Sequence, residues 1–246
     1  MNRFFSNEDT VITEKYVEIY GEDVNHIRNV LRLRVGEGIT LCNGLGRDYL
    51  CKLSDITQEK VVADIVDICD NLSELDTKIT LFQGYPKSDK LELIIQKTIE
   101  LGVSRIVPVM TKRTVVKLDD KKAGKKTKRY EGIALAAAKQ CGRGIVPEIM
   151  EPVSFKEAID MAKGLDMSII PYEEAEGIEY SRKVLSDIKG KGTLGIFIGP
   201  EGGFDREEVE LAMKSGIIPI TLGHRILRTE TAGMAVMSII MFEIEK

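Results

Sequence analysis

Two glycine-containing segments near the C-terminus hold the strongest candidates for a ligand-binding or catalytic site. The first spans residues 199–204 with the sequence GPEGGF, and the second spans residues 222–232 with the sequence LGHRILRTETA. Each segment follows a short apolar run typical of a β-strand and precedes a pattern typical of a helix. Ligands of open α/β sheets bind at the carboxyl ends of the strands, so we expect both segments to line one pocket.

The first segment predicts a sharply turning loop. Three glycines and one proline within five residues expose backbone N–H and C=O groups and let a flat ligand approach without obstruction by Cβ atoms. Such a loop suits a nucleoside better than a chain of phosphates. The alternative is purely structural, a tight strand-to-helix turn that leads into a helix capped by Asp205.

The second segment places Arg225 and Arg228 three residues apart in otherwise apolar surroundings. Guanidinium groups beside a glycine-lined pocket are expected to recognise or stabilise negative charge that develops on a substrate oxygen. The alternative is a salt bridge between Arg228 and Glu230, with Thr229 capping the final helix. His224 lies in the same segment, and a lone histidine is more often structural than catalytic.

The predicted secondary structure changes character near residue 72. Before that point, period-two apolar runs broken by glycine turns predict a small β-rich domain, with strands over residues 17–20, 39–42, 49–53 and 61–68. One helix is predicted over residues 23–31, with Asp23 as its cap. Three arginines, Arg28, Arg32 and Arg34, lie in this helix or just after it.

From residue 78 onward, strand-like and helix-like patterns alternate, which predicts an α/β domain with a mainly parallel sheet covered on both faces. Strands are expected over residues 79–82, 103–109, 167–170, 194–198 and 217–222. Helices are expected from Ser88 as cap to Gly102, over about 178–188, over 206–214 and in a long apolar segment at the C-terminus. Capping-box spacings mark two helix starts, at Ser154 with Glu157 and at Asp205 with Glu208.

Charge is unevenly distributed along the chain. The net charge of −4 argues against a protein whose whole surface is basic, yet residues 111–143 hold eleven lysines and arginines against three acidic residues. This stretch is either a solvated loop with a helix face or a surface that contacts phosphates.

Several classes of site are disfavoured. Four cysteines without C-x-x-C spacing and only two histidines predict no metal site and reduced thiols. No signal-peptide pattern and no apolar run of about 20 residues occur, so we expect a cytoplasmic chain that is not in a membrane. The G-x-G-x-x-G sequence of residues 190–195 precedes a strand instead of following one, so it does not predict a dinucleotide site.

The two C-terminal segments resemble the signature segments of the bacterial 16S ribosomal RNA uridine-N3 methyltransferase family, RsmE, within the SPOUT superfamily. The resemblance extends over nearly the whole chain and includes residues 3–5, 26–33, 90–97 and 140–143. His224 is a departure, because proline is the more usual residue there. The backbone role of that position should survive the change.

The resemblance implies a PUA-like β-barrel over residues 1–72 that binds RNA and a SPOUT methyltransferase domain over residues 73–246. It also implies a homodimer and a C-terminal trefoil knot. General fold rules would have argued against the knot, because threaded chains are very rare. In such folds the loops of the knot hold S-adenosylmethionine. The implied cofactor contacts are Gly199, Glu201, Gly202, Leu222, Gly223, Ile226 and Leu227.

The implied reaction has two physical requirements. Methyl transfer from a sulfonium needs nucleophile, carbon and sulfur in line, and uridine N3 must lose its proton or have its anion stabilised. We expect Arg228, and second to it Arg225, to stabilise that anion, with Glu230 and Glu201 as bases or orienting groups. Because N3 lies on the Watson–Crick edge, the target uridine must be unpaired or extruded.

The implied partner is 16S ribosomal RNA within the small ribosomal subunit. We expect it to contact arginines of the first domain and the start of the basic stretch, namely Arg3, Arg28, Arg32, Arg34, Lys112 and Arg113. Two other hypotheses stay open: an enzyme that binds a different nucleotide in the same pocket, and a non-catalytic RNA-binding ribosome assembly factor.

Overall fold

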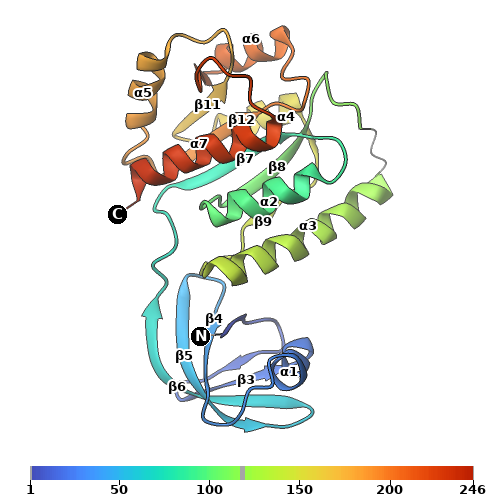
Figure 1. The fold of residues 1–246 in the computed structure, drawn as a ribbon, viewed down its shortest axis with the longest axis vertical. Helices are drawn as coiled ribbons and strands as arrows, with labels where there is room; N and C mark the ends of the chain where they lie inside the picture. The colour runs from blue at the N-terminus through green and yellow to red at the C-terminus, as the bar shows by residue number, and fades with distance from the viewer. Residues whose placement is uncertain (1, 117–119, 246) are drawn as a thin grey trace. The chain divides into compact units, whose positions relative to one another are not determined.

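The computed structural model describes residues 2–116 and 120–245, and the chain forms two compact units (Figure 1). Unit 1 comprises Met1–Glu74 and Ala138–Val146, and unit 2 comprises Leu75–Ala137 and Pro147–Lys246. The short segment Ala138–Val146 thus packs within unit 1, although the family resemblance implied a second domain over all of residues 73–246. The domain boundary at residues 72 and 73 stays a prediction.

Unit 1 is built on a six-stranded sheet in which one pair of strands is parallel and the others are antiparallel. Its order is β1 (Asn2–Phe5), β4 (Gly38–Cys42), β5 (Arg47–Ile56), β6 (Lys60–Asp70), β3 (Tyr16–Tyr20) and β2 (Val11–Ile12). The four predicted strands are confirmed as β3 to β6. The strands β1 and β2 were not predicted, because they are too short to show a clear alternation.

The core of unit 1 shows that this sheet is curled. Phe4 on β1 and Val17 on β3 belong to one buried cluster, together with Leu41 and Leu53 from the strands between them. The pairing of β5 with β6 has two register shifts, between Leu50 and Cys51 and between Leu53 and Asp55, and such bulges bend a sheet. The sheet therefore curves around this core.

The predicted helix over residues 23–31 is shorter and less regular than expected. It consists of α1 (Glu22–Asn25) followed by a π-helical turn over His26–Val30, in which the Leu31 N–H donates to the His26 carbonyl. Asp23 does not cap it, since no side chain does and Asp23 instead pairs with Lys139. Arg32 follows at φ +54°, a left-handed conformation that is uncommon for a residue other than glycine and that ends the helical turn.

Unit 2 contains the parallel sheet that the alternation predicted. Its order is β10 (Val153–Ser154), β8 (Arg105–Met110), β7 (Lys78–Gly84), β12 (Thr193–Ile198), β11 (Met167–Pro171) and β13 (Ile218–Ile220), and β9 (Glu148–Ile149) pairs with β8. All of its pairs are parallel.

Helices cover both faces of this sheet, as expected. On one face, α4 (Phe155–Ala162) and α6 (Arg206–Lys214) pack against Phe82 and Phe197, whose rings stack. Neighbouring strand residues point to the opposite face, where α7 (Thr229–Ile244) lies close to Ile198 and packs on α2 (Lys90–Glu100). Figure 1 shows α2 and α7 in this arrangement, with α5 (Ile178–Ser186) also in unit 2.

Two helix-start signals of unit 2 are confirmed and one is wrong. Both predicted capping boxes form, at the starts of α4 and α6. Ser88 was the wrong cap for α2: it has φ +54°, and the helix begins at Lys90 after Asp89. Gly102 ends that helix in the expected left-handed conformation, at φ +93°.

The basic stretch contains a long helix, α3 (Asp120–Cys141), which the sequence predicted only in part. Its lysines follow one another too closely to show a clear amphipathic period. Lys117 lies outside the described residues, and so do the side chains of Lys121 and Lys122.

The path into α7 returns the chain from the edge of the sheet to its middle. Strand β13 is an edge strand, yet the Thr229 side chain at the start of α7 donates to the carbonyl of Gly199, just after the central strand β12. This path is consistent with the knot, which itself stays a prediction. Within residues 2–116 and 120–245, no helix is long and apolar enough to cross a bilayer.

Candidate active site

The first loop (residues 199–204) connects β12 to α6 and folds tightly on itself. A Cβ atom on Gly199 would lie 3.0 Å from the backbone of Gly203, and one on Gly84 of β7 would lie 2.5 Å from Pro200. These two glycines are therefore needed for packing within the protein. The sequence pattern suggested that Gly199 lets a ligand approach, whereas in the structure Gly199 lets the backbone of Gly203 approach.

The second loop (residues 221–228) connects β13 to α7 and is fixed at its start. The Thr221 N–H donates to the Ser181 hydroxyl at 2.8 Å, and the Gly223 N–H donates to the Thr221 hydroxyl at 3.2 Å. Gly223 has φ +101°, which favours glycine, and a Cβ atom there would meet nothing within 4 Å. The space beside Gly223 is thus open.

The rest of the second loop presents groups that the protein itself does not use. Ile226 is 91 % exposed, and Arg225 and Arg228 are exposed and form no ion pair with any residue that the structure describes. The backbone N–H groups of residues 224–228 also donate no hydrogen bond to any residue that the structure describes. The loop therefore offers an apolar side chain, several donors and two cations to a ligand.

The structural alternative for this loop is wrong. Glu230 does not pair with Arg228, because its Oε2 lies 3.3 Å from the Lys90 Nζ. Arg228, and not Thr229, occupies the N-cap position of α7.

The two loops are joined by a buried hydrogen-bond chain. The Thr229 hydroxyl donates to the Gly199 carbonyl at 2.6 Å and accepts from the Gln83 Nε2 at 2.8 Å. Gln83 is fully buried and Thr229 is 4 % exposed. Because Thr229 directly follows Arg228, this chain places the arginine-bearing loop next to the glycine-rich one.

The candidate acid Glu201 is held in its ionised form. Its carboxylate accepts from the Lys87 N–H at 3.1 and 3.3 Å and pairs with the Lys90 Nζ at 3.2 Å. Partial burial alone would raise the pKa of Glu201, but the backbone N–H groups and Lys90 outweigh it and hold that pKa below its usual value. Glu201 is therefore a weak proton acceptor and is suited to orienting its surroundings.

Lys90 is a site residue that was not predicted from the sequence. It lies in a segment that carries the resemblance, but nothing in the local pattern assigns it a partner. The hydrogen bond with Glu201, and after it the contact with Glu230, raises the pKa of Lys90, so its ammonium stays charged.

The predicted RNA contacts of unit 1 have different environments. Arg3 forms a two-pronged pair with Asp48 at 2.7 to 2.9 Å, and both side chains are only 11 % exposed. This placement favours a role in the stability of unit 1. Arg32 and Arg34 are exposed and Arg28 is half-buried, and none of the three forms an ion pair within the described residues. Their guanidinium groups are therefore accessible for the predicted contacts with RNA.

The two residues of unit 2 that were predicted to contact RNA, Lys112 and Arg113, bind to the first loop and to the start of α6. Arg113 donates to the Gly202 carbonyl at 2.8 Å and lies 3.6 Å from the Asp205 carboxylate. Lys112 pairs with Glu207 and lies 3.7 Å from Asp205. Both residues thus connect the end of β8 to the start of α6, and their contact with RNA stays a prediction.

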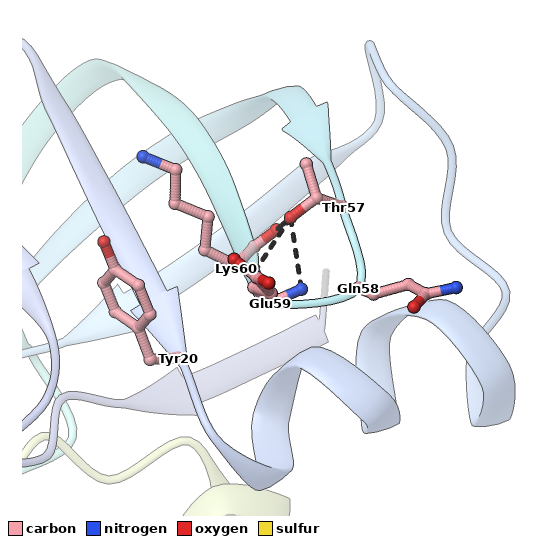
Figure 2. Close-up of a pocket in the computed structure, with 5 residues that line it drawn as sticks. All are labelled: Tyr20, Thr57, Gln58, Glu59 and Lys60. Carbon is pink, nitrogen blue, oxygen red and sulfur yellow. Dashed lines mark hydrogen bonds between the residues drawn. The ribbon is translucent and has the colours of Figure 1, made fainter.

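A pocket in unit 1 is lined by residues that lie far from both loops in the sequence. Figure 2 shows its lining at the turn between β5 and β6, with Tyr20, Thr57, Gln58, Glu59 and Lys60. The Thr57 hydroxyl donates to the Lys60 carbonyl and accepts from two N–H groups, so it stabilises the turn itself. No predicted site residue lines this pocket.

Comparisons with known proteins give the family. A family model described as an RNA methyltransferase domain matches residues 73–241, and one described as an RNA methyltransferase PUA domain matches residues 19–66. The ribosomal RNA small subunit methyltransferase E of Bacillus subtilis is 38 % identical over 255 residues, covering 100 % of this chain and 98 % of the relative. The protein of the same name from Mesomycoplasma hyopneumoniae is 33 % identical, covering 95 % of this chain and 96 % of the relative.

A solved structure agrees with this result. The crystal structure of ribosomal RNA small subunit methyltransferase E from Neisseria gonorrhoeae, bound to S-adenosyl methionine, matches with a TM-score of 0.83 and 31 % identity, covering 97 % of this chain and 95 % of that chain. Similarity over the full length of both units, with both family models in the expected order, shows that the chain belongs to the ribosomal RNA small subunit methyltransferase E family.

Proposed function

We propose that this protein transfers a methyl group from S-adenosylmethionine to N3 of a uridine near the 3′ end of 16S ribosomal RNA in the small subunit. One observation carries the proposal: the Thr229 hydrogen bond to Gly199 fixes the exposed Arg228, which pairs with no acidic residue among those described, beside the glycine-rich first loop. The relatives named above are ribosomal RNA methyltransferases of the small subunit, which supports the same substrate class.

The second loop fits the nucleoside part of the cofactor. The exposed Ile226 side chain offers an apolar surface to a flat base, and the open space beside Gly223 leaves room for it. The unused N–H groups of residues 224–228 offer donors to the polar edge of the base. The residues proposed to hold the cofactor are Gly199, Glu201, Gly202, Leu222, Gly223, Ile226 and Leu227. When bound, S-adenosylmethionine supplies an electrophilic methyl group on a positively charged sulfur.

The arginines of the second loop would act on the acceptor base. Arg228 lies at the N-cap of α7, where the helix dipole adds positive potential, so negative charge is favoured beside it. Arg228, with Arg225, would stabilise the uracil anion spread over N3 and the neighbouring carbonyl oxygens, and the N3 proton would pass to water. Glu201 and Glu230 are then orienting groups, because both lie beside the Lys90 ammonium.

The RNA would be held through its phosphates by unit 1. The exposed Arg32 and Arg34 and the half-buried Arg28 are available there. A ribosomal substrate of this kind also supports a cytoplasmic location.

We also propose that a second copy of the chain covers α7. This helix is apolar on more than its buried side, and its exposed residues include Ile239 at 45 % and Phe242 at 85 % exposure. Exposed apolar patches of this kind mark interfaces between proteins. Replacing Phe242 with glutamate should therefore shift the protein from dimer to monomer in sedimentation velocity, and an unchanged dimer would contradict this interface.

The direct test of the function is methyl transfer. The purified protein is incubated with S-adenosylmethionine labelled in its methyl group and with small subunits from a strain that lacks the homologous enzyme. We expect label in 16S RNA, and mapping of the modified base should locate it at N3 of one uridine. RNA that stays unlabelled under all conditions would rule out the function, and label at another base would rule out the target.

A further inference from the structure

Lys90, the first residue of α2, lies between two carboxylates that come from the two loops. Its Nζ is 3.2 Å from the Glu201 Oε1 and 3.3 Å from the Glu230 Oε2. We propose that Lys90 is a positioning residue for the proposed methyl transfer, which acts by holding Glu230 away from Arg228. The inference rests on the proposed function and assigns a role that neither the sequence nor the comparisons give.

A strained turn places Lys90 at this point. Ser88, two residues earlier, has φ +54°, a conformation that is costly for a residue with a Cβ atom. Such strain persists where the surrounding structure fixes it, and it is common at functional sites. Here the turn aims the Lys87 N–H at the Glu201 carboxylate and starts α2 so that Lys90 reaches both loops.

The two carboxylates depend on Lys90 to different degrees. Glu201 keeps its hydrogen bond from the Lys87 N–H whether or not Lys90 is present. The Oε2 atom of Glu230 is buried and has no hydrogen bond within the described residues, so the Lys90 ammonium is the positive charge that compensates it. Loss of Lys90 would therefore release Glu230 and leave the first loop largely in place.

A released Glu230 has an obvious new partner. Arg228 is two residues away in the chain, is exposed and forms no ion pair within the part of the chain that the structure describes. An ion pair between them would neutralise the guanidinium that the proposed reaction needs for the developing anion. Lys90 thus keeps Arg228 available, and its effect should appear in turnover and not in the binding of the cofactor.

The experiment compares Lys90→Met with a matched control, Lys97→Met. Lys97 lies on the same helix with a similar exposure, and it pairs with Glu100 of that helix. Methyl transfer to saturating small subunits gives kcat, and calorimetry gives the Kd for S-adenosylmethionine. We expect Lys90→Met to lower kcat roughly 10- to 100-fold, as small misplacements of catalytic groups do, and to change the Kd by less than about 3-fold.

Two further variants separate positioning from general damage. Lys90→Arg keeps the charge and should recover most of the lost turnover. The double variant Lys90→Met/Glu230→Gln lacks the Glu230 carboxylate that could pair with Arg228. Its kcat should therefore be no more than about 2-fold below that of the single variant Glu230→Gln.

Three results would overturn the inference alone while the wild type stays active: a Lys90→Met enzyme with wild-type kcat, an equal loss of kcat in Lys97→Met, or the same slowing by Lys90→Met with and without Glu230. A wild-type protein that transfers no methyl group to the subunits would overturn the proposed function and this inference with it.

Discussion

Replacing Thr229 with valine tests the connection between the two loops most directly. Valine has nearly the same shape as threonine, but it removes the hydroxyl that donates to the Gly199 carbonyl and accepts from the Gln83 Nε2. Gln83 lies in the interior of unit 2 and Gly199 is half-buried, so water can replace the lost hydroxyl only in part. The Gly199 carbonyl would lose the one hydrogen bond that the described residues give it.

The cost can be worked out from these contacts. Leaving the half-buried Gly199 carbonyl without its partner costs up to about 1–3 kcal/mol, and the hydrogen bond from Gln83 contributes about 0.5–1.5 kcal/mol more. Part of the stabilisation by Gln83 is retained in the variant, because the Gln83 Nε2 also donates to the Gly84 carbonyl at 3.0 Å. The free energy of unfolding of Thr229→Val should therefore fall by about 2–4 kcal/mol.

Urea denaturation measures this loss. The chain has no tryptophan, so unfolding is followed by far-UV circular dichroism. With a slope of roughly 2–3 kcal/mol per molar urea, the midpoint should move down by about 1 M. The matched control is Thr98→Val: Thr98 is also fully buried, but its hydroxyl donates to the Ile94 carbonyl of its own helix, which already accepts a backbone N–H. A shift for Thr229→Val no larger than for Thr98→Val would refute the reasoning.

Three other predictions follow from named contacts. Arg228→Ala should lower methyl transfer about 100-fold or more and leave the Kd for S-adenosylmethionine within about 3-fold, whereas equal losses would make Arg228 structural. The pKa of Glu74 is lowered, because its hydrogen bonds with Arg143 and two backbone N–H groups outweigh its burial. The ionised Glu74 carboxylate stabilises the fold fully above the pKa of the unfolded carboxyl, and this stabilisation is lost as the pH falls through the lower folded pKa. Glu74→Gln should therefore be less stable than the wild type at pH 7, and its free energy of unfolding should change less between about pH 5 and 3. Arg32→Ala and Arg34→Ala should each weaken RNA binding and lower the slope of log affinity against log salt by about 1, and an unchanged slope would contradict a phosphate contact.

Much of the local structure could be predicted from the sequence. Period-two and period-3.6 patterns, and the capping boxes at Ser154 and Asp205, depend on residues close in the chain, so they were readable directly. The parallel sheet followed from the alternation of strands and helices. The glycine and arginine segments of the two loops were specific enough to identify the family, which the comparisons confirm.

The pairing of charged side chains could not be predicted from the sequence and became visible only in the folded chain. Lys87 and Glu201 are 114 residues apart in the chain, and nothing near either residue indicates the other. The same holds for Arg3, which looked like a surface arginine but is buried against Asp48. A local pattern describes a residue's neighbours in the chain, whereas the partner of a charged side chain depends on which loops the sheet brings to one edge. For this reason the sequence could name Arg228 and Glu230 as chemical groups, but only the folded chain showed that Lys90 stands beside Glu230.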